Sequence, residues 1–434
     1  MVETKLNIAF CSVPMVGHLN PLLPYAAELI KRGHSVTVFH EAHPKYRQKI
    51  ESSGAKEVIS VTYDCQNDDN KSWSGIIFDC VKSYYEGQAT LPSVMVYEFF
   101  AVEAADAADA LGVPSIGVFP NPRSVNRWAA TLEDQNTLKW KLWCAFMWQV
   151  EPILARVLWC FRSWGRFKRG LPVLPEQDLY PSPYMPRPMI GCTTPLIEFP
   201  DLPEAPLFHM VGPSIPTVAD PIEPDLNSWL EAQKDKPIVY VAFGTMYKYN
   251  EETIQKLEAD FLALGNSVSV LWSLPKQHQS SLITQPPPQN WRVESFFPQV
   301  SLFKTGKIGV FVTHCGSNSV YEALVSGVPM VCYPQFADQP ANATRLVRAG
   351  VGLIARKGML GDALKNMLGK LDVFAKASKD LAAALNSNNA AQQAADLIEQ
   401  VASGEHLVNK NRRLPLLPLF LAGAAVPIAI VALA

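Results

Sequence analysis

Phe311-Val312-Thr313-His314-Cys315-Gly316-Ser317-Asn318-Ser319 is the stretch of this 434-residue chain that decides the fold. A short apolar run ends at Thr313, small and polar residues follow, and a helical pattern opens near Ser319. This order predicts a strand, a tight turn and a helix, the unit from which doubly wound α/β sheets are built. The unpaired N–H groups at the start of such a helix suit a diphosphate.

The same alternation of short apolar runs and amphipathic helices recurs on both sides of this stretch. In the first half it predicts elements over Leu6–Phe10, Leu19–Arg32, Ser35–Phe39, Ser93–Tyr97, Ala101–Leu111 and Ser115–Phe119. In the second half it predicts elements over Ile238–Phe243, Glu251–Leu264, Ser267–Ser273, Val310–Thr313, Ser319–Ser326 and Pro329–Tyr333. We therefore expect an α/β protein whose two Rossmann-like domains face each other across a cleft.

The predicted boundaries follow these changes in pattern. Residues 1–213 form an N-terminal domain, 214–236 a linker, 237–405 a C-terminal domain and 406–434 a tail. The end of the tail is uncharged, follows several basic residues and has about the ~20 residues that a bilayer crossing requires. Prolines interrupt it, so it is either a membrane anchor or a docked or disordered segment.

Composition excludes several classes of partner and activity. Lys plus Arg total 38 and Asp plus Glu total 40, giving a formal net charge of −2, so we expect no nucleic-acid partner. The 8 cysteines include no CxxC pair, which fits neither a zinc site nor a disulfide framework. No signal peptide is recognisable, so a cytoplasmic location is expected. No GxGxxG follows the first predicted strand, which argues against a nicotinamide dehydrogenase.

Polar residues follow the predicted strands of the second half, at the carboxyl edge where open α/β sheets bind ligands. Glu322 lies one turn into the predicted helix, where its carboxylate can accept two hydrogen bonds from a ribose diol. Asp338 and Gln339 offer acceptors and donors for sugar hydroxyls. The full set, His314, Asn318, Ser319, Glu322, Asp338 and Gln339, predicts a nucleotide-sugar site.

The run from Phe296 to Asn342 resembles the signature of the UDP-glycosyltransferases, a family with the two-domain GT-B fold. The likeness extends to Pro14–His18 and Val239–Thr245, and covers most of the chain up to about residue 400. It implies a hexosyltransferase that inverts configuration and moves a sugar, with glucose favoured, from a UDP-sugar to a hydroxyl. The implied acceptor is a small apolar phenol, sterol or secondary metabolite, and neither a metal nor any cofactor is required.

The resemblance also implies a role for each donor-site residue. Phe296 would stack on uracil and Gln299 would bond its edge, while Glu322 would take the ribose hydroxyls. His314, Gly316, Asn318 and Ser319 would hold the diphosphate with Thr245 nearby, and Asp338 and Gln339 the sugar. Plant members usually have Trp where this chain has Phe296 and Ser317. The first change keeps an aromatic face, whereas the second alters contacts to the far side of the sugar.

Transfer to a hydroxyl requires a base, and histidine is suited to this near neutral pH. His18 lies in the turn after the first predicted strand, and the resemblance makes it the base. Family members orient this ring with an acidic residue, usually Asp, and the matching residue here is Glu98. Its longer side chain needs a slightly retracted backbone. The alternatives are a structural histidine at His18 and, at Glu98, a charge that complements a helix dipole.

Six of the ten tryptophans lie between Trp128 and Trp164. Trp140, Trp143, Phe146 and Trp148 form either an acceptor wall or a helix packed on the N-terminal sheet. Arg162, Arg166, Lys168 and Arg169 could touch anionic lipid headgroups or simply mark a charged helix end. Two other functions stay open: a non-catalytic accessory subunit that binds UDP-sugars, and a UDP-sugar epimerase.

Overall fold

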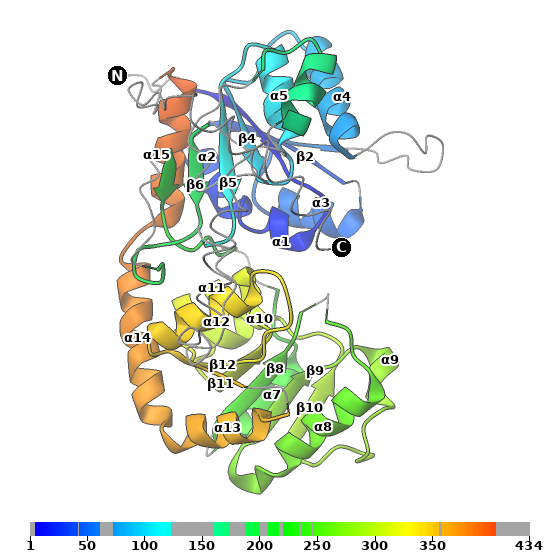
Figure 1. The fold of residues 1–434 in the computed structure, drawn as a ribbon, viewed down its shortest axis with the longest axis vertical. Helices are drawn as coiled ribbons and strands as arrows, with labels where there is room; N and C mark the ends of the chain where they lie inside the picture. Colours follow the sequence, from blue (N-terminus) through cyan, green and yellow to red (C-terminus); the bar gives the residue numbers. More distant parts are fainter. Residues whose placement is uncertain are drawn as a thin grey trace, which may run out of the picture.

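The computed structural model describes residues 5–41, 43–60, 73–122, 160–173, 187–199, 207–216, 220–233, 236–244, 247–355 and 358–404. Within these ranges the chain forms two parallel α/β units, one after the other (Figure 1). The predictions for Thr245, for the aromatic wall at 140–148 and for the tail 406–434 fall outside the described residues. In the part that is described, no helix is both long enough and apolar enough to span a membrane.

Seven parallel strands among the described residues make the N-terminal sheet, in the order β3-β2-β1-β4-β5-β6-β7. The elements are β1 (Asn7–Cys11), α1 (Val16–Leu19), α2 (Leu23–Lys31), β2 (Ser35–His40), α3 (Pro44–Glu51), β3 (Glu57–Ser60), α4 (Trp73–Glu86), β4 (Val94–Glu98), α5 (Glu103–Ala110), β5 (Ser115–Phe119), β6 (Met189–Gly191) and β7 (Phe208–Met210). The strand order reverses between β1 and β4, which is where doubly wound sheets bind ligands.

The C-terminal sheet has six parallel strands in the described residues, ordered β10-β9-β8-β11-β12-β13. The elements are α7 (Pro224–Ala232), β8 (Ile238–Ala242), α8 (Glu251–Leu262), β9 (Ser269–Ser273), α9 (Lys276–Gln279), β10 (Trp291–Glu294), α10 (Gln299–Lys304), β11 (Ile308–Thr313), α11 (Ser317–Val325), β12 (Met330–Cys332), α12 (Gln339–Arg348), β13 (Gly352–Ile354), α13 (Leu360–Gly369), α14 (Leu371–Asn386) and α15 (Ala390–Ala402). Here the order reverses between β8 and β11.

The predicted α/β fold is confirmed, because each strand and helix predicted from the apolar pattern is present within a few residues. The helix expected over Leu19–Arg32 differs in one respect: it divides into α1 and α2 around Pro21. Proline lacks the N–H that a continuous helix would use there. The predicted linker 214–236 contains α7, whose Leu226 and Leu230 are buried in the core.

Alternate residues of β1 enter cores on opposite faces of the sheet. Ile8 and Phe10 pack in the cluster that includes α2 and α15, whereas Ala9 and Cys11 pack in the one with α4 and α5. Every residue of β4 is buried, as expected for a parallel strand covered by helices on both faces. This burial includes one charged side chain, Glu98.

The last described helix, α15, lies on the N-terminal domain. It contacts α2, β4 and β5, whereas α14 packs on α11 in the C-terminal domain. Figure 1 shows α14 beside the C-terminal domain and α15 beside the N-terminal domain. The sequence pattern assigned residues up to 405 to the C-terminal domain, so α15 corrects that assignment. The other boundaries stay predictions.

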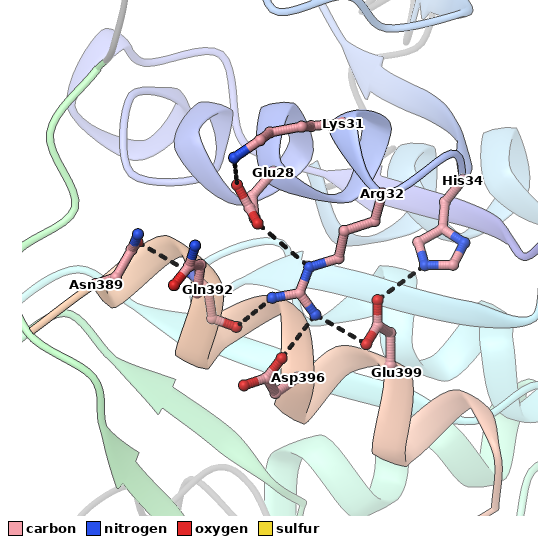
Figure 2. A network of polar contacts seen from close by, with 8 residues as sticks. All are labelled: Glu28, Lys31, Arg32, His34, Asn389, Gln392, Asp396 and Glu399. Atoms are coloured by element: carbon pink, nitrogen blue, oxygen red, sulfur yellow. Dashed lines mark hydrogen bonds and ion pairs between the residues drawn. The ribbon is translucent and has the colours of Figure 1, made fainter. Parts of the chain in front are cut away.

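Arg32, at the end of α2, forms hydrogen bonds and ion pairs that hold α15 against the N-terminal domain (Figure 2). Its guanidinium donates to Asp396 Oδ1 at 2.6 Å and to Glu399 Oε2 at 2.9 Å. His34 Nε2 lies 2.8 Å from Glu399 Oε1, and His34 Nδ1 accepts the backbone N–H of Leu6 at 3.2 Å. Because Nδ1 accepts, Nε2 carries the hydrogen and donates to Glu399. The network therefore connects α15 with the start of β1.

We expect Arg32→Ala to loosen α15, because Glu28, Asp396 and Glu399 lose the cation that they share. The free energy of unfolding should fall by about 1–2 kcal/mol, since these pairs are partly exposed. Thermal denaturation measures this change, and limited proteolysis should cut the connection between α14 and α15 faster. Lys31→Ala is the control, because Lys31 pairs only weakly with Glu28, at 3.5 Å. Unchanged proteolysis of Arg32→Ala would contradict this assignment.

Three arginines at the end of the stretch that contains six tryptophans contact one buried carboxylate. Arg162 donates to the buried Asp106 of α5 at 2.7 Å, Arg166 binds the same carboxylate, and Arg169 lies 3.3 Å from it. These ion pairs hold the helix that ends the segment against α5. The lipid-contact interpretation is therefore wrong for these three arginines, which lie at a charged helix end and are paired with Asp106. Lys168 lies over the ring of Trp164.

Candidate active site

Two segments meet where the order of the N-terminal strands reverses. β1 leads to His18 in α1, and β4 ends at Glu98, with Cys11 paired to Tyr97 across the two strands. Nδ1 of His18 lies 2.8 Å from Oε1 of Glu98. The backbone N–H of Phe100 donates to the other carboxylate oxygen at 3.0 Å. With Nδ1–H directed at Glu98, Nε2 is the ring nitrogen that can accept a proton.

Burial governs the electrostatics of this pair. Glu98 is completely buried, and this burial raises its pKa above the ordinary value although the hydrogen bonds from His18 and Phe100 oppose the rise. The helix-dipole alternative for Glu98 is wrong, because the first turn of α5 begins later and contains Glu103 and Asp106. The ring of His18 keeps some solvent access and meets Phe100 edge to face at 5.0 Å.

In the C-terminal domain, β8 and β11 end side by side and create a narrow space for His314. A Cβ on Gly244 would lie 2.8 Å from Nε2 of His314, and a Cβ on Gly316 would lie 2.5 Å from the same atom. Only glycine at both positions lets the ring lie between the two backbones. Burial lowers the pKa of His314, so the ring is neutral near pH 7 and donates through one nitrogen.

The turn between β11 and α11 is held by a residue to which the sequence assigned no role. Cys315 has a left-handed backbone, φ 67°, which is costly for a residue with a side chain. Asn342 donates from Nδ2 to the Cys315 carbonyl at 2.9 Å and to Asp338 Oδ2 at 2.8 Å. The detectable signal was the spacing: Asn342 lies four residues after Asp338, one turn along the helix. α11 begins at Ser317, two residues earlier than predicted.

The residues predicted to hold uracil and ribose contact one another. Gln299 Nε2 donates to Glu322 Oε2 at 2.6 Å and to Ser319 Oγ at 3.3 Å. Burial raises the pKa of Glu322, and the bond from Gln299 opposes that shift. Phe296 is 62% exposed, so its aromatic face is open to a planar ring.

One hydrogen bond joins the two halves of the predicted site. Asn318, in the first turn of α11, donates from Nδ2 to the carbonyl of Gly17 at 3.0 Å. A Cβ on Gly17 would lie 3.3 Å from that nitrogen, so glycine permits the close approach. The loop predicted to bind the diphosphate therefore touches the turn that carries His18. A buried ion pair, Arg345 with Glu198 at 3.0 Å, also crosses between the domains.

The described residues contain no group of three or more His, Cys, Asp or Glu side chains arranged to hold a metal ion. The sequence-based expectation that catalysis needs no metal stays a prediction.

One segment of the chain matches a known family of sequences. Residues 194–377 match the sequence model described as UDP-glucoronosyl and UDP-glucosyl transferase, a range that includes α11, α12 and the turn around His314. The segment that contains the predicted donor site is therefore similar to the UDP-glycosyltransferase family. The match covers the predicted donor site, whereas His18 and Glu98 lie before its first residue.

Curated relatives of the chain are plant transferases. A myricetin 3-O-rhamnosyltransferase of Crocosmia x crocosmiiflora is 38% identical over 153 residues, which is 33% of this chain and 33% of that protein. An anthocyanidin 3-O-glucosyltransferase of Fragaria ananassa is 34% identical over 170 residues, or 34% and 36% of the two chains. The alignments thus span about a third of the length of these UDP-glycosyltransferases.

Solved structures share the fold over almost the whole chain. The glycotransferase of kitacinnamycin has a TM-score of 0.69 and 23% identity, covering 92% of this chain and 99% of that one. A UDP-glucose:anthocyanidin 3-O-glucosyltransferase in complex with UDP has a TM-score of 0.67 and 18% identity, covering 93% and 100%. These similarities confirm the GT-B fold that the family resemblance implied.

Proposed function

We propose that this chain is an inverting glycosyltransferase that moves a hexose, with glucose favoured, from a UDP-sugar to a hydroxyl of a small apolar acceptor. The observation that supports the proposal most strongly is the hydrogen bond from Asn318 to Gly17. This bond joins the start of α11, whose N–H groups suit a diphosphate, to the turn that carries His18. The ring of His18 is in turn paired with the buried carboxylate of Glu98.

In the proposed reaction the acceptor hydroxyl gives its proton to Nε2 of His18 as its oxygen bonds to the anomeric carbon. The bond between that carbon and the diphosphate oxygen breaks, and UDP leaves with the electron pair. Glu98 fixes the tautomer of His18 and stabilises the imidazolium that forms. Attack from the face opposite the leaving group inverts the anomeric configuration.

The departing diphosphate would be stabilised by fixed dipoles. The backbone N–H groups at the start of α11, together with the neutral ring of His314, direct hydrogen atoms toward the developing negative charge. Phe296 would stack on uracil. Gln299 and Glu322 would bind the nucleoside after the hydrogen bond between them breaks and each side chain bonds the ligand instead. This arrangement needs no metal, so we propose that activity persists in EDTA.

The proposed acceptors follow from the names of the relatives. Myricetin and anthocyanidin are aromatic polyphenols, and the relatives above act on one hydroxyl of each. Phe100, 54% exposed beside His18, supplies an apolar surface next to the base that suits a planar aromatic acceptor.

The decisive experiment incubates the full chain with UDP-glucose and a panel of flavonols, simple phenols and sterols, in buffer containing EDTA. Formation of UDP together with a product heavier by one hexose supports the proposal. An accessory subunit would bind UDP-glucose without releasing UDP. An epimerase would convert UDP-glucose to an isomer in the absence of any acceptor.

We expect Gly316→Ala to weaken UDP binding about 10-fold, because the new Cβ displaces His314 from its place between the two glycines. Calorimetric titration with UDP measures the change. Gly369→Ala is the matched control, because a Cβ there meets no atom within 4 Å. If both variants bind UDP as the wild type does, His314 does not hold the diphosphate.

A further inference from the structure

Ser317 and Asn342 hold the same oxygen of Asp338. Ser317 Oγ donates to Asp338 Oδ2 at 2.8 Å, and Asn342 Nδ2 donates to that oxygen at 2.8 Å. Ser317 is 7% exposed and Asn342 is 2% exposed, so both donors are fixed by their surroundings. With Oδ2 occupied twice, Oδ1 is the oxygen with which Asp338 can accept a hydroxyl of the sugar.

The side-chain amide of Gln339 is also fixed, but through its oxygen, so that its nitrogen stays available as a donor. Its Oε1 accepts the backbone N–H groups of Gln335 at 2.9 Å and Phe336 at 3.2 Å. Its carbonyl therefore closes the turn before α12, and its Nε2 is left as the donor. The two neighbouring residues thus offer a sugar one acceptor, Asp338 Oδ1, and one donor, Gln339 Nε2, both held in position by the protein.

We infer that Ser317 is a positioning residue for donor-sugar selectivity, acting through the carboxylate of Asp338. The inference rests on the proposed function, because it assumes that Asp338 and Gln339 meet the sugar. A site whose polar atoms are fixed rejects an epimer strongly, since a misplaced hydroxyl leaves a buried group without its partner. Without the Ser317 bond, Asp338 keeps only Asn342 on Oδ2 and can rotate to meet either epimer.

Ser317 and Asn342 also differ in their other hydrogen-bond partners. Asn342 supports the strained Cys315 carbonyl as well as Asp338, so its loss would disturb the turn that faces the diphosphate. Ser317 donates to Asp338 and accepts from Asn342 at 3.1 Å. A small cavity lies beside Ser317, lined in part by Val320 and Leu346. Thr is therefore the conservative replacement, because it keeps the hydroxyl.

The test measures binding by calorimetry on the full chain without an acceptor, so it does not depend on turnover. The ligands are UDP, UDP-glucose and UDP-galactose, which differ in sugar content or in the configuration at one carbon. We expect the wild type to prefer UDP-glucose, and Ser317→Ala to reduce that preference about 5- to 10-fold. The affinity for UDP should change less than about 2-fold, because UDP lacks the sugar that Asp338 meets.

Two further variants complete the test. Ser317→Thr should restore the preference for UDP-glucose. Ser378→Ala removes a buried hydroxyl in α14 that has no hydrogen-bond partner in the described structure, and should change nothing.

An unchanged preference in Ser317→Ala, or no preference in the wild type, overturns the inference while UDP binding still supports the proposed function. Equal weakening of UDP and UDP-glucose also overturns it, because the hydroxyl would then support the turn rather than the sugar. A wild-type chain that binds no UDP ligand overturns the inference and the proposed function together.

Discussion

His18→Ala should lower turnover by about 10²–10⁴-fold, because the acceptor hydroxyl loses the base that removes its proton. The affinity for UDP should change little, since the nucleotide would lie on the C-terminal domain around α11. Initial rates with UDP-glucose and an aromatic acceptor measure the first effect, and calorimetry with UDP measures the second. Loss of rate with retained binding is the pattern that separates a catalytic histidine from one that only supports the fold.

The control for this variant is His278→Ala, which removes an imidazole from α9 in the C-terminal domain, next to Tyr249. We expect it to retain the wild-type rate. Turnover of His18→Ala within a few-fold of the wild type would rule out the base assigned here. A parallel loss of UDP affinity would instead indicate that Gly17 and Asn318 no longer meet.

The sequence predicts the fold of this chain well because parallel strands are buried on both faces. β8, and β4 as far as Tyr97, are short, uninterrupted apolar runs, and such runs are visible without a structure. The strands β6, β7 and β13 have three residues each and were not predicted, whereas β12 is equally short but lies within the recognisable run Pro329–Tyr333. The place of α15 was also beyond prediction, because its amphipathic face would fit either domain.

In the candidate site, the sequence predicts the local backbone structure but not the side-chain contacts between distant residues. The turn around His314 is a local property, and the sequence predicts its strand, turn and helix. The partners of its side chains are distant: Asn318 bonds Gly17, and Gln299 bonds Glu322. Such pairs depend on how sheets and domains pack, which no single stretch encodes. Asn342 was not predicted for this reason, since two of its three acceptors, Cys315 and Ser317, lie 27 and 25 residues before it, at the turn between β11 and α11.

Glu98→Gln should lower turnover by about 10²–10⁴-fold while leaving the fold at least as stable. The two oxygens of Glu98 accept from His18 Nδ1 and from the N–H of Phe100. Gln has only one such oxygen, and when Phe100 takes it the amide N–H faces Nδ1 of His18. The ring must then accept at Nδ1 and carry its hydrogen on Nε2, which is the tautomer that cannot remove a proton from the acceptor. Glu98→Asp keeps the charge and should retain part of the activity.

The pH dependence of stability tests the same residue independently. Burial raises the pKa of Glu98 in the folded protein, so the carboxyl favours folding when protonated and loses that contribution as the pH rises through the raised pKa. Gln is neutral at every pH, so Glu98→Gln should melt about 1–3 °C above the wild type at pH 8. The difference should vanish near pH 4, where the wild-type carboxyl is also protonated. A variant that keeps wild-type turnover, or that melts lower at pH 8, would show that the buried charge neither orients His18 nor costs stability.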